Sequence, residues 1–569
     1  MRRAEGPKAE DGKPAAGMPH YPGADVGSAG GRDVVCEDIT AESGRLSRRK
    51  LLRSAGYLLS ASVVAGGSGT ASAAEPGAAA DKSPAALLPA PPARVPGAAK
   101  PSTTPSNTPP AVMREFRGVW VATVQNVDWP SRRGLSAEEQ KAELAALLDR
   151  AAALRLNAVV FQVRPSSDAI YNSALEPWSE YVTGQMGLNP GYDPLEFATT
   201  EAHRRGLELH AWFNPFRVRR LAEKTPAAAN HVSVTHPEWV RTYGHYLWLD
   251  PGDKAAREWV VQVISDVVQR YDVDGVHLDD YFYPYVENDA QKRPIPFPDD
   301  ATWLRYQQGG GTLSRADWRR ENINDFVQAM YAAVKASKRW VKVGISPFGI
   351  WRPGNPPQIK GLDAYSELYA DSRKWLTSGW VDYLAPQLYW PIAQAPQSFP
   401  ALLGWWLSQN ETARHIWPGL FTSRVGDRWR PEELVYQVKT TRGLEANGAI
   451  HFSMKALVNN PEGVADALAA QVYEEPALAP VSPWLSGGGQ LAAPSAAIET
   501  GAGGGRTLRW NPGADAHLWI VQIRSKGQWT TMIFPADVLR LAMEPGVERA
   551  AVTGIDRVGV AGPTTVLDG

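Results

Sequence analysis

Two adjacent aspartates, Asp279 and Asp280, close the apolar run VDGVHLDD and are followed at once by YFYP. Neighbouring carboxylates repel each other unless one of them is protonated or both are used in a reaction. A carboxyl group that stays protonated near neutral pH can donate to a leaving oxygen, and its ionised neighbour can stabilise the positive charge that develops. We therefore predict that this pair performs acid catalysis rather than a structural role.

The alternation of side chains along a strand shows which way the first of these carboxyls points. Val276 and Leu278 share the apolar parity and are expected under helices, whereas His277 and Asp279 share the other parity. Asp279 is then the last side chain of its strand that points toward the axis of a closed sheet.

The same parity predicts inward-pointing polar residues on other strands. They are Gln162, Arg164, Glu208, His210, Trp212, Asn214, His451, Ser453, Gln387 and Tyr389. Barrel enzymes place their active sites at the carboxyl ends of the strands, where Arg164, Asn214 and Gln387 fall, together with Tyr389. Glu208 and His210 lie deeper in their strand and fit a buried polar network that fixes the core.

The elements that must position these residues alternate regularly along the chain. Strand-like runs occur at 115–124, 156–165, 207–216, 273–280, 341–349, 381–390, 415–423 and 448–455. Amphipathic helical patterns lie between them, and Ser136 with Glu139 has the spacing of a capping box. Eight βα units within 112–475 predict an α/β protein with a (β/α)8 TIM barrel. A doubly wound sheet is the alternative, and no glycine-rich dinucleotide motif supports it.

Both flanks of this region differ from it in composition. Residues 476–569 show strand alternation without helices and predict a small β-sandwich, similar to a fibronectin type III module. Such modules most often act as spacers, and glycan binding is the alternative role. Residues 75–111 are rich in proline and alanine and are expected to form an extended linker.

The N-terminal 74 residues carry an expected export signal. Within 45–74, a basic region with Arg48 and Arg49 precedes an apolar stretch and a small-residue cleavage site, which is typical of a twin-arginine signal peptide. The apolar stretch is too short and too rich in Gly and Ser for a permanent membrane anchor. We therefore expect an exported protein, extracellular or associated with the cell wall.

The composition narrows the partners. Lys+Arg 59 against Asp+Glu 60 leaves a formal net charge of -1, which gives no electrostatic basis for binding nucleic acid. The single cysteine, Cys36, cannot form an internal disulfide. Many of the 22 tryptophans adjoin proline or polar residues, and flat amphipathic rings at loop positions suit stacking on sugars. We expect a monomer without a cofactor that acts on a polysaccharide.

The barrel region resembles the glycosyl-hydrolase-like ten family of bacterial envelope proteins. The resemblance rests on FRGVWVATVQNVDWPS, FQVRPSSDAIY, PGYDPLEFATTEAHRRGLELHAWFNPFRV, YDVDGVHLDDYFYP, WRRENINDFV, GISPFGIWRP and VDYLAPQLYWP. It implies a TIM barrel that hydrolyses glycosidic bonds in peptidoglycan glycan strands, particularly strands that lack stem peptides. It also implies an active site at Asp279 and Asp280. The substrate-binding residues expected around them are Arg164, Trp212, Asn214, His277, Tyr281, Gln387, Tyr389 and Trp390.

The sequence leaves the mechanism open. Retaining glycosidases need two carboxyls about 5 to 5.5 Å apart, and inverting ones need about 6.5 to 9.5 Å. Loop residues that offer a second carboxylate are Asp128, Asp168, Asp250, Glu287 and Asp427. The alternative is substrate assistance, in which an N-acetyl group attacks its own anomeric carbon. The fourth strand loosely resembles the DGxDxDxE strand of chitinases that work this way, and Tyr389 is placed to orient the acetamido oxygen.

Two other classes of function compete with this interpretation. A metal-dependent hydrolase or deacetylase would use His210, His277 and Asp279 as ligands, although no HxH or HxxxH spacing is present. A catalytically inactive glycan-binding envelope protein would use the same aromatic residues.

Overall fold

The computed structural model describes residues 107–511 and 516–569. The predicted extension and signal peptide at 1–74 lie outside the described residues, as does most of the predicted linker. Within the described ranges, no helix combines the length and the apolar character needed to cross a bilayer.

The expected strands form one parallel sheet that curls into a TIM-barrel-like arrangement. Its order is β11-β10-β9-β8-β4-β3-β2-β13-β12. The two segments at the ends of this order, β11 and β12, are consecutive in the chain and are separated only by Trp417 and Pro418. This strand pairs with β10 before Pro418 and with β13 after it, and a single bridge between Gly419 and Gln387 keeps it beside the β10 segment as well. The strands are β2 (Phe116–Val121), β3 (Ala158–Arg164), β4 (Glu208–Phe213), β8 (Gly275–Leu278), β9 (Lys342–Ile345), β10 (Tyr383–Leu384), β11 (His415–Ile416), β12 (Gly419–Leu420) and β13 (Gly448–His451).

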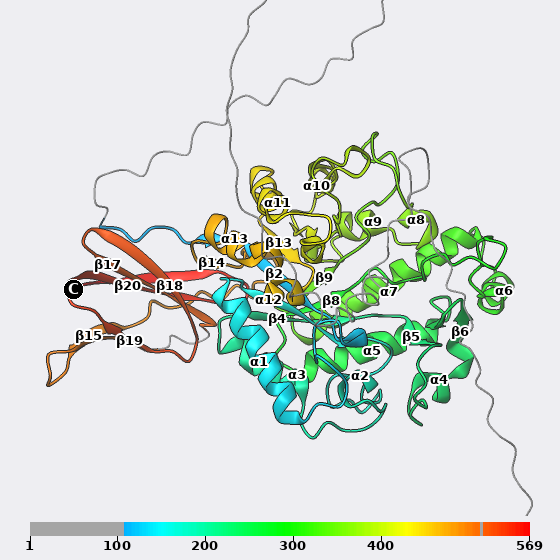
Figure 1. Cartoon of the computed structure of the whole chain (residues 1–569), viewed down its shortest axis with the longest axis horizontal. Helices are drawn as coiled ribbons and strands as arrows, with labels where there is room; N and C mark the ends of the chain where they lie inside the picture. The colour runs from blue at the N-terminus through cyan, green and yellow to red at the C-terminus, as the bar shows by residue number, and fades with distance from the viewer. Residues whose placement is uncertain (1–106, 512–515) are drawn as a thin grey trace, which may run out of the picture. The chain divides into compact units, whose positions relative to one another are not determined.

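Helices follow the strands along the chain and surround the sheet (Figure 1). The longer ones are α1 (Ala137–Ala153), α3 (Pro194–His203), α5 (Lys254–Arg270), α6 (Asp300–Gln308), α7 (Arg315–Ser337), α10 (Phe399–Ser408), α11 (Pro431–Gly443) and α13 (Val464–Gln471). The shorter ones are α2 (Glu180–Thr183), α4 (Val232–Thr235), α8 (Ala364–Glu367), α9 (Ser372–Thr377) and α12 (Met454–Asn459). The predicted capping box of α1 is confirmed, because the Glu139 N–H donates to Ser136 Oγ and the Glu139 carboxylate accepts from the Ser136 N–H.

The core between sheet and helices confirms the parity argument. Val276 and Leu278 of β8 are fully buried in the same apolar cluster as Val263 of α5 and Met330 of α7. The side chains of opposite parity point into the sheet's interior, where His277 of β8 meets Tyr383 of β10.

All eight predicted runs extend beyond the strands they contain, most of all the sixth. Of the run 381–390, only Tyr383–Leu384 form a strand, because Pro386 interrupts the pairing. Gln387 contributes single bridges to Phe348 and Gly419, and Tyr389 lies beyond it on the following loop. The fifth strand ends at Ile345, two residues before Pro347.

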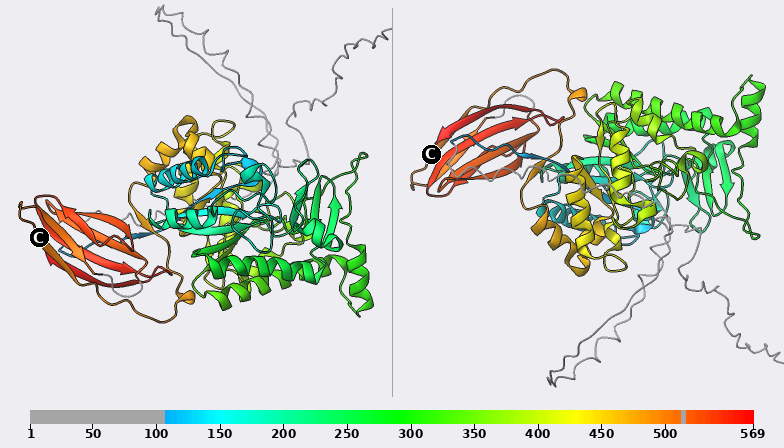
Figure 2. Two further views of the ribbon diagram at one scale, coloured as in Figure 1. Left: turned by 90° about the horizontal axis from the view of Figure 1, so that it is seen from below. Right: turned by 90° about the horizontal axis from the view of Figure 1, so that it is seen from above.

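Two connections between strands are enlarged, which the sequence did not reveal. The chain between β4 and α5 forms an antiparallel sheet of order β5-β7-β6, and the chain between β8 and α7 carries α6. The strands of this antiparallel sheet are β5 (Arg217–Arg220), β6 (Val240–Tyr243) and β7 (Tyr246–Leu249). The two enlargements lie side by side in Figures 1 and 2.

The expected C-terminal strands are present as two antiparallel sheets, of order β15-β16-β19 and β18-β17-β20-β21. Leu508 and Trp510 of the first sheet pack with Trp519, Val521 and Val552 of the second in one apolar cluster. The strands are β15 (Ala496–Thr500), β16 (Arg506–Trp510), β17 (Leu518–Ser525), β18 (Gln528–Pro535), β19 (Arg540–Met543), β20 (Val547–Ile555) and β21 (Ala561–Asp568). A short parallel pair, β1 (Met113–Arg114) and β14 (Ala477–Leu478), joins the start of the barrel to the segment that precedes the two C-terminal sheets.

Candidate active site

Asp279 lies immediately after the end of β8, and its carboxylate is held by β4. Its Oδ2 accepts hydrogen bonds from Trp212 Nε1 and from Asn214 Nδ2, both at 3.0 Å. Asp279 is only 4% exposed. The structure therefore brings together three residues that the sequence had placed on the inward faces of two different strands.

The environment of Asp279 favours its protonated form near neutral pH. Burial raises the pKa of Asp279 to about 7, with a further rise from the charge of Asp280. The guanidinium of Arg217 and the hydrogen bonds from Trp212 and Asn214 oppose this rise. A carboxyl with this pKa is present in both protonation states at neutral pH, as a general acid requires.

Asp280 has different partners from its neighbour. Its Oδ2 accepts a hydrogen bond from the Tyr285 hydroxyl, and the Gln387 side chain also stabilises its carboxylate. Burial raises the pKa of Asp280, and these two partners oppose the rise. The Gln387 amide in addition donates to the Ser346 carbonyl at 3.0 Å, so it joins the ends of β9 and β10 to the acid pair.

Arg217 of β5 is an active-site residue that the sequence analysis missed. Its charge lowers the pKa of both Asp279 and Asp280. Its guanidinium carbon lies 4.5 Å from the centre of the Tyr281 ring, which places Tyr281 beside the acid pair. The only sequence signal was its position three residues after Asn214, within NPFRV.

Arg164 supports the site from within the protein. It is fully buried and forms a two-pronged ion pair with Glu176, with nitrogen–oxygen distances of 2.8 and 2.5 Å. Its remaining N–H groups donate to Ser167 Oγ and to the carbonyls of Asn214 and Pro215. All of its donors are thus used inside the protein, so Arg164 positions the Asn214 loop and has no N–H left for a ligand.

His277 belongs to a chain of hydrogen bonds that crosses the barrel interior. Trp120 Nε1 donates to His277 Nε2 at 3.1 Å, so the His277 proton is on Nδ1, which lies 3.0 Å from the Tyr383 hydroxyl. Tyr383 in turn donates to His210 Nδ1 at 2.8 Å, and His210 Nε2 donates to Glu208. Burial holds the pKa of His277 well below its usual range, and it is neutral. His277 therefore forms part of the floor of the barrel rather than a sugar contact.

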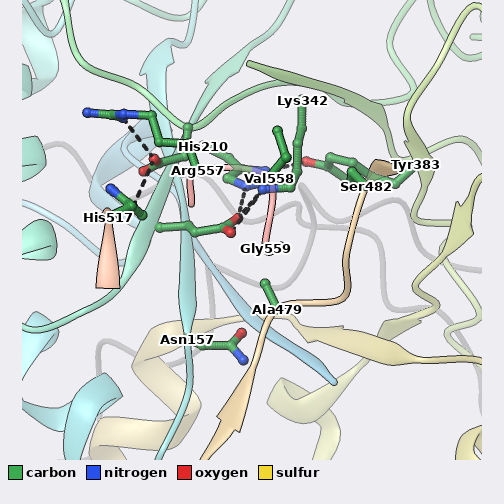
Figure 3. Close-up of polar contacts among 12 residues, drawn as sticks. Asn157, His210, Lys342, Tyr383, Ala479, Ser482, His517, Arg557, Val558 and Gly559 are labelled. Atoms are coloured by element: carbon green, nitrogen blue, oxygen red, sulfur yellow. Dashed lines mark hydrogen bonds and ion pairs between the residues drawn. The ribbon is translucent and has the colours of Figure 1, made fainter. Parts of the chain in front are cut away.

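The same chain answers the metal-site alternative. His210 and His277 use both ring nitrogens on protein partners, so neither has a nitrogen available for a metal shared with Asp279. Lys342 completes the chain with an ion pair to Glu208 at 2.9 Å (Figure 3).

In the part of the chain that the structure describes, one group of side chains has ligand atoms close enough to hold a metal ion, and it is His203, Asp274 and His517. It lies where the barrel meets the C-terminal strands. His203 Nε2 already bonds Asp274 at 2.8 Å, and the guanidinium of Arg557 lies 3.6 Å from the same carboxylate (Figure 3). The positive charge of Arg557 disfavours a cation, so this group is an ion-pair cluster.

The aromatic residues at the end of β10 have unequal exposure. Tyr389 is half-buried, and its ring centre lies 4.7 Å from that of Phe421 and 6.0 Å from that of Phe452. Trp390 is buried, packs edge-on against Phe348 and accepts a hydrogen bond on its carbonyl from Gln437. Tyr389 is therefore the better placed of the two for contact with a ligand.

Among the candidate second carboxylates, Asp128 is the one that lies opposite Asp279. It accepts hydrogen bonds from the Ala122 N–H, after β2, and from Ser453 Oγ, after β13. Because β13 lies four positions from β8 in either direction around the sheet, Asp128 lies across the barrel mouth from Asp279. Burial raises the pKa of Asp128 to about 6, against these hydrogen bonds.

The other four candidates have local partners. Asp168 is buried between acidic neighbours, and burial raises its pKa to about 7. The remaining three form ion pairs, Asp250 with Arg241 at 2.9 Å, Glu287 with His245 at 2.7 Å and Asp427 with Arg424 at 3.0 Å.

A buried carboxyl pair at the carboxyl end of a strand, in a curled parallel sheet surrounded by helices, is the arrangement of glycoside hydrolases of the TIM-barrel class. Comparison with known proteins agrees with this class. The model of the family "Glycosyl hydrolase-like 10" matches residues 115–436. The chain belongs to this family and is a glycosidase.

Two bacterial relatives share the barrel region. The chain is 42% identical over 386 residues to glycosyl hydrolase YngK of Bacillus subtilis, a match that covers 65% of this chain and 74% of the relative. It is 36% identical over 352 residues to glycosyl hydrolase DigH of Escherichia coli, which covers 58% of this chain and 77% of the relative. Among solved structures, the glycoside hydrolase domain of PgaB (BpsB) from Bordetella bronchiseptica is 16% identical, with a TM-score of 0.43, over 63% of this chain and 99% of that one.

Proposed function

We propose that the chain is an exported glycosidase that cleaves N-acetylated glycan strands of peptidoglycan, with Asp279 as the general acid. The observation that carries the proposal is the hydrogen bonding of Asp279. Trp212 and Asn214 both donate to its Oδ2, which therefore carries no proton of its own. The proton of the acid form is then on Oδ1.

Catalysis would proceed by proton transfer from that oxygen. Asp279 Oδ1 donates its proton to the glycosidic oxygen as the bond to the anomeric carbon breaks, and the electron pair leaves with the departing sugar. The carboxylate of Asp280, held by Tyr285 and Gln387, stabilises the positive charge that develops on the sugar ring. Asp279, now ionised, accepts a proton from the water that completes hydrolysis.

Substrate assistance is our preferred source of the nucleophile. In this version the N-acetyl oxygen attacks the anomeric carbon, and the half-buried ring of Tyr389 orients that oxygen. The competing version uses Asp128 as a base across the barrel mouth. The two versions differ in their need for the acetyl group, so rapid cleavage of a de-N-acetylated glycan would exclude the first.

The choice of peptidoglycan rests on the family resemblance and on the predicted twin-arginine signal peptide within 45–74. A folded enzyme exported past the membrane meets the cell wall as its nearest polysaccharide. The C-terminal strands fit a fibronectin type III-like spacer, since three strands in one sheet and four in the other share one core.

The test is incubation of the secreted protein with purified peptidoglycan, with and without stem peptides, followed by mass analysis of the products. We expect new reducing ends, most from strands without peptides, and none with Asp279→Asn or Asp280→Asn. Tight binding without any rise in reducing ends would contradict catalysis and favour a glycan-binding protein. Loss of activity on adding a chelator would favour the metal-dependent class.

A further inference from the structure

A cavity lies apart from the acid pair, between the enlarged connections of the barrel. Its volume is about 790 Å³. It is bounded by the starts of α5 and α7, by α6 and by the segment before β6. The residues that matter most are Trp239, Gly252, Arg305, Tyr306 and Trp318.

Three aromatic rings line this cavity. Tyr306 of α6 and Trp318 of α7 have ring centres 5.9 Å apart, and both pack against Trp303, which stacks on one face of Tyr306. Trp239 enters from the segment before β6, stacks one face on His236 at 3.8 Å between ring centres, and is half-buried, as is Tyr306. Rings of this kind offer flat apolar faces beside polar edges, which match the C–H faces and hydroxyl rims of sugar rings.

A glycine makes room for the largest ring. A Cβ atom at Gly252 would lie 2.5 Å from the ring of Trp318 and 2.9 Å from Thr302 Oγ1. Any other residue would displace either Trp318 or the start of α5. The cavity is thus shaped by tight packing and is not a loose gap between helices.

The charged groups of the lining nearly balance. Four carboxylates face three basic side chains, and they are Asp253, Glu258, Glu321 and Asp325 with Lys254, Arg257 and Arg305. Several are already paired, such as Arg305 with Asp253 at 2.8 Å and Lys254 with Glu258 at 3.1 Å. A balanced lining of this kind gives no net attraction for a phosphate polymer, whereas paired carboxylates and guanidiniums can still hydrogen-bond to hydroxyls.

The cavity is built on the same two connections as the acid pair. Asp250, which precedes α5, accepts a hydrogen bond from Thr302 of α6 at 2.8 Å. Trp248 of β7 donates to the carbonyl of Phe282, three residues after Asp279, at 2.9 Å. Hydrogen bonds therefore join the segments that carry the cavity to the segment that follows the acid pair.

We propose that this cavity is a second saccharide-binding site, which takes an uncharged N-acetylated sugar unit of the glycan. The proposal rests on the function proposed above for its choice of sugar. Trp239 and Tyr306 stack on the sugar ring, and the paired charges around them bond its hydroxyls. The site holds glycan to the enzyme outside the reacting bond.

The test uses the full chain carrying Asp279→Asn, so that no glycan is cleaved, with the soluble tetramer of N-acetylglucosamine as the probe in calorimetric titration. We expect two binding components. Adding Trp239→Ala or Tyr306→Ala weakens one component about tenfold, the scale of a lost aromatic contact, and Tyr306→Phe, which keeps the ring, restores it. Trp380→Ala is the matched control, because Trp380 is a half-buried tryptophan outside the cavity.

A single binding component with the same affinity in all variants would overturn the proposal. Thermal unfolding of each variant checks that folding is kept, and Tyr306→Phe provides the comparison if an alanine variant unfolds. Cleavage by the unmodified chain is measured separately. No cleavage of any glycan, with the second component intact, contradicts the proposed function alone, whereas cleavage with unchanged titrations contradicts the second site alone.

Discussion

An aspartate flanks strand β8 at each end, and the two carboxyls behave in opposite ways. Asp274 precedes Gly275, and Asp279 follows Leu278. Both are 4% exposed, so burial by itself does not distinguish them. Burial acts to raise the pKa of both carboxyls. It outweighs the opposing effects only at Asp279, whose pKa reaches about 7. The pKa of Asp274 is strongly lowered.

The difference comes from the charge of their partners. At the amino end, His203 at 2.8 Å, His517 and Arg557 surround Asp274 with positive or protonatable groups, and the Leu209 N–H donates to it at 2.8 Å. At the carboxyl end, Asp279 has two neutral donors, the more distant effect of Arg217, and a second carboxylate beside it. The neighbouring groups thus keep Asp274 ionised, which stabilises the folded protein. They leave Asp279 able to hold a proton near neutral pH, which suits it to acid catalysis.

The largest expected effect is on turnover. Asp279→Asn should lower the rate of glycan cleavage by about 10³-fold or more, since it removes a general acid. Asp274→Asn in folded protein should leave the rate within a few-fold. Initial rates of reducing-end release measure both. Equal losses in the two variants would remove the functional distinction between the two ends.

The next largest effect is on stability, and here Asp274 is the sensitive residue of the two. Asp274→Asn removes the buried carboxylate that bonds His203, while Arg557 keeps its ion pair with Asp272 at 2.6 Å, and it should cost about 3 kcal/mol in the free energy of unfolding. Because the pKa of Asp274 is lowered in the folded state, its stabilisation is present above its ordinary value of about 3.8 and is lost as pH falls below it. Denaturant unfolding at neutral and acidic pH measures the difference in the free energy of unfolding between the native chain and the variant. This difference should become smaller in acid. A difference independent of pH would contradict the ionised state of Asp274.

A smaller effect sharpens the roles within the acid pair. Tyr285→Phe removes the hydroxyl that donates to Asp280 and should lower kcat about tenfold, the scale of one hydrogen bond to a charged group. Tyr436→Phe, which removes the hydroxyl of an exposed tyrosine on α11, is the matched control. An unchanged kcat in Tyr285→Phe would mean that Asp280 does not stabilise the transition state.

The smallest effect is a shift in pH dependence. The protonated fraction of Asp279 falls as pH rises through about 7, so activity should decline above that pH. Trp212→Phe removes a hydrogen bond that favours the ionised carboxylate, which raises the pKa of Asp279 and moves this decline to higher pH by less than about one unit. The pH profile of kcat/KM measures the shift, and a move to lower pH would contradict the acid role.

Much of the barrel could be predicted because its periodicity is local. The alternation in VDGVHLDD gave the correct inward face for His277 and Asp279, and the capping box of α1 was readable from Ser136 and Glu139. Strand lengths were less predictable, since Pro386 and Pro418 break pairing at points that an apolar run does not reveal. The β5-β7-β6 sheet was missed because its strands are short and interrupted by loops.

The surroundings of the acid pair were less predictable, because they depend on contacts between distant segments. Trp212 and Asn214 could be placed beside Asp279 by parity, but Arg217 and Tyr285 reach the pair only through the enlarged connections. Arg164 and His277 were expected to bind substrate. Their donors are satisfied within the protein, by Glu176 for the first and by Tyr383 for the second, and no sequence pattern encodes that pairing.

The hydrogen-bonded chain across the barrel interior runs one way. The indole of Trp120 only donates and the carboxylate of Glu208 only accepts, so each proton between them has a single resting place. A chain that could reverse would switch between two electrical states of similar energy. This one has a single direction, so the barrel floor carries a fixed dipole.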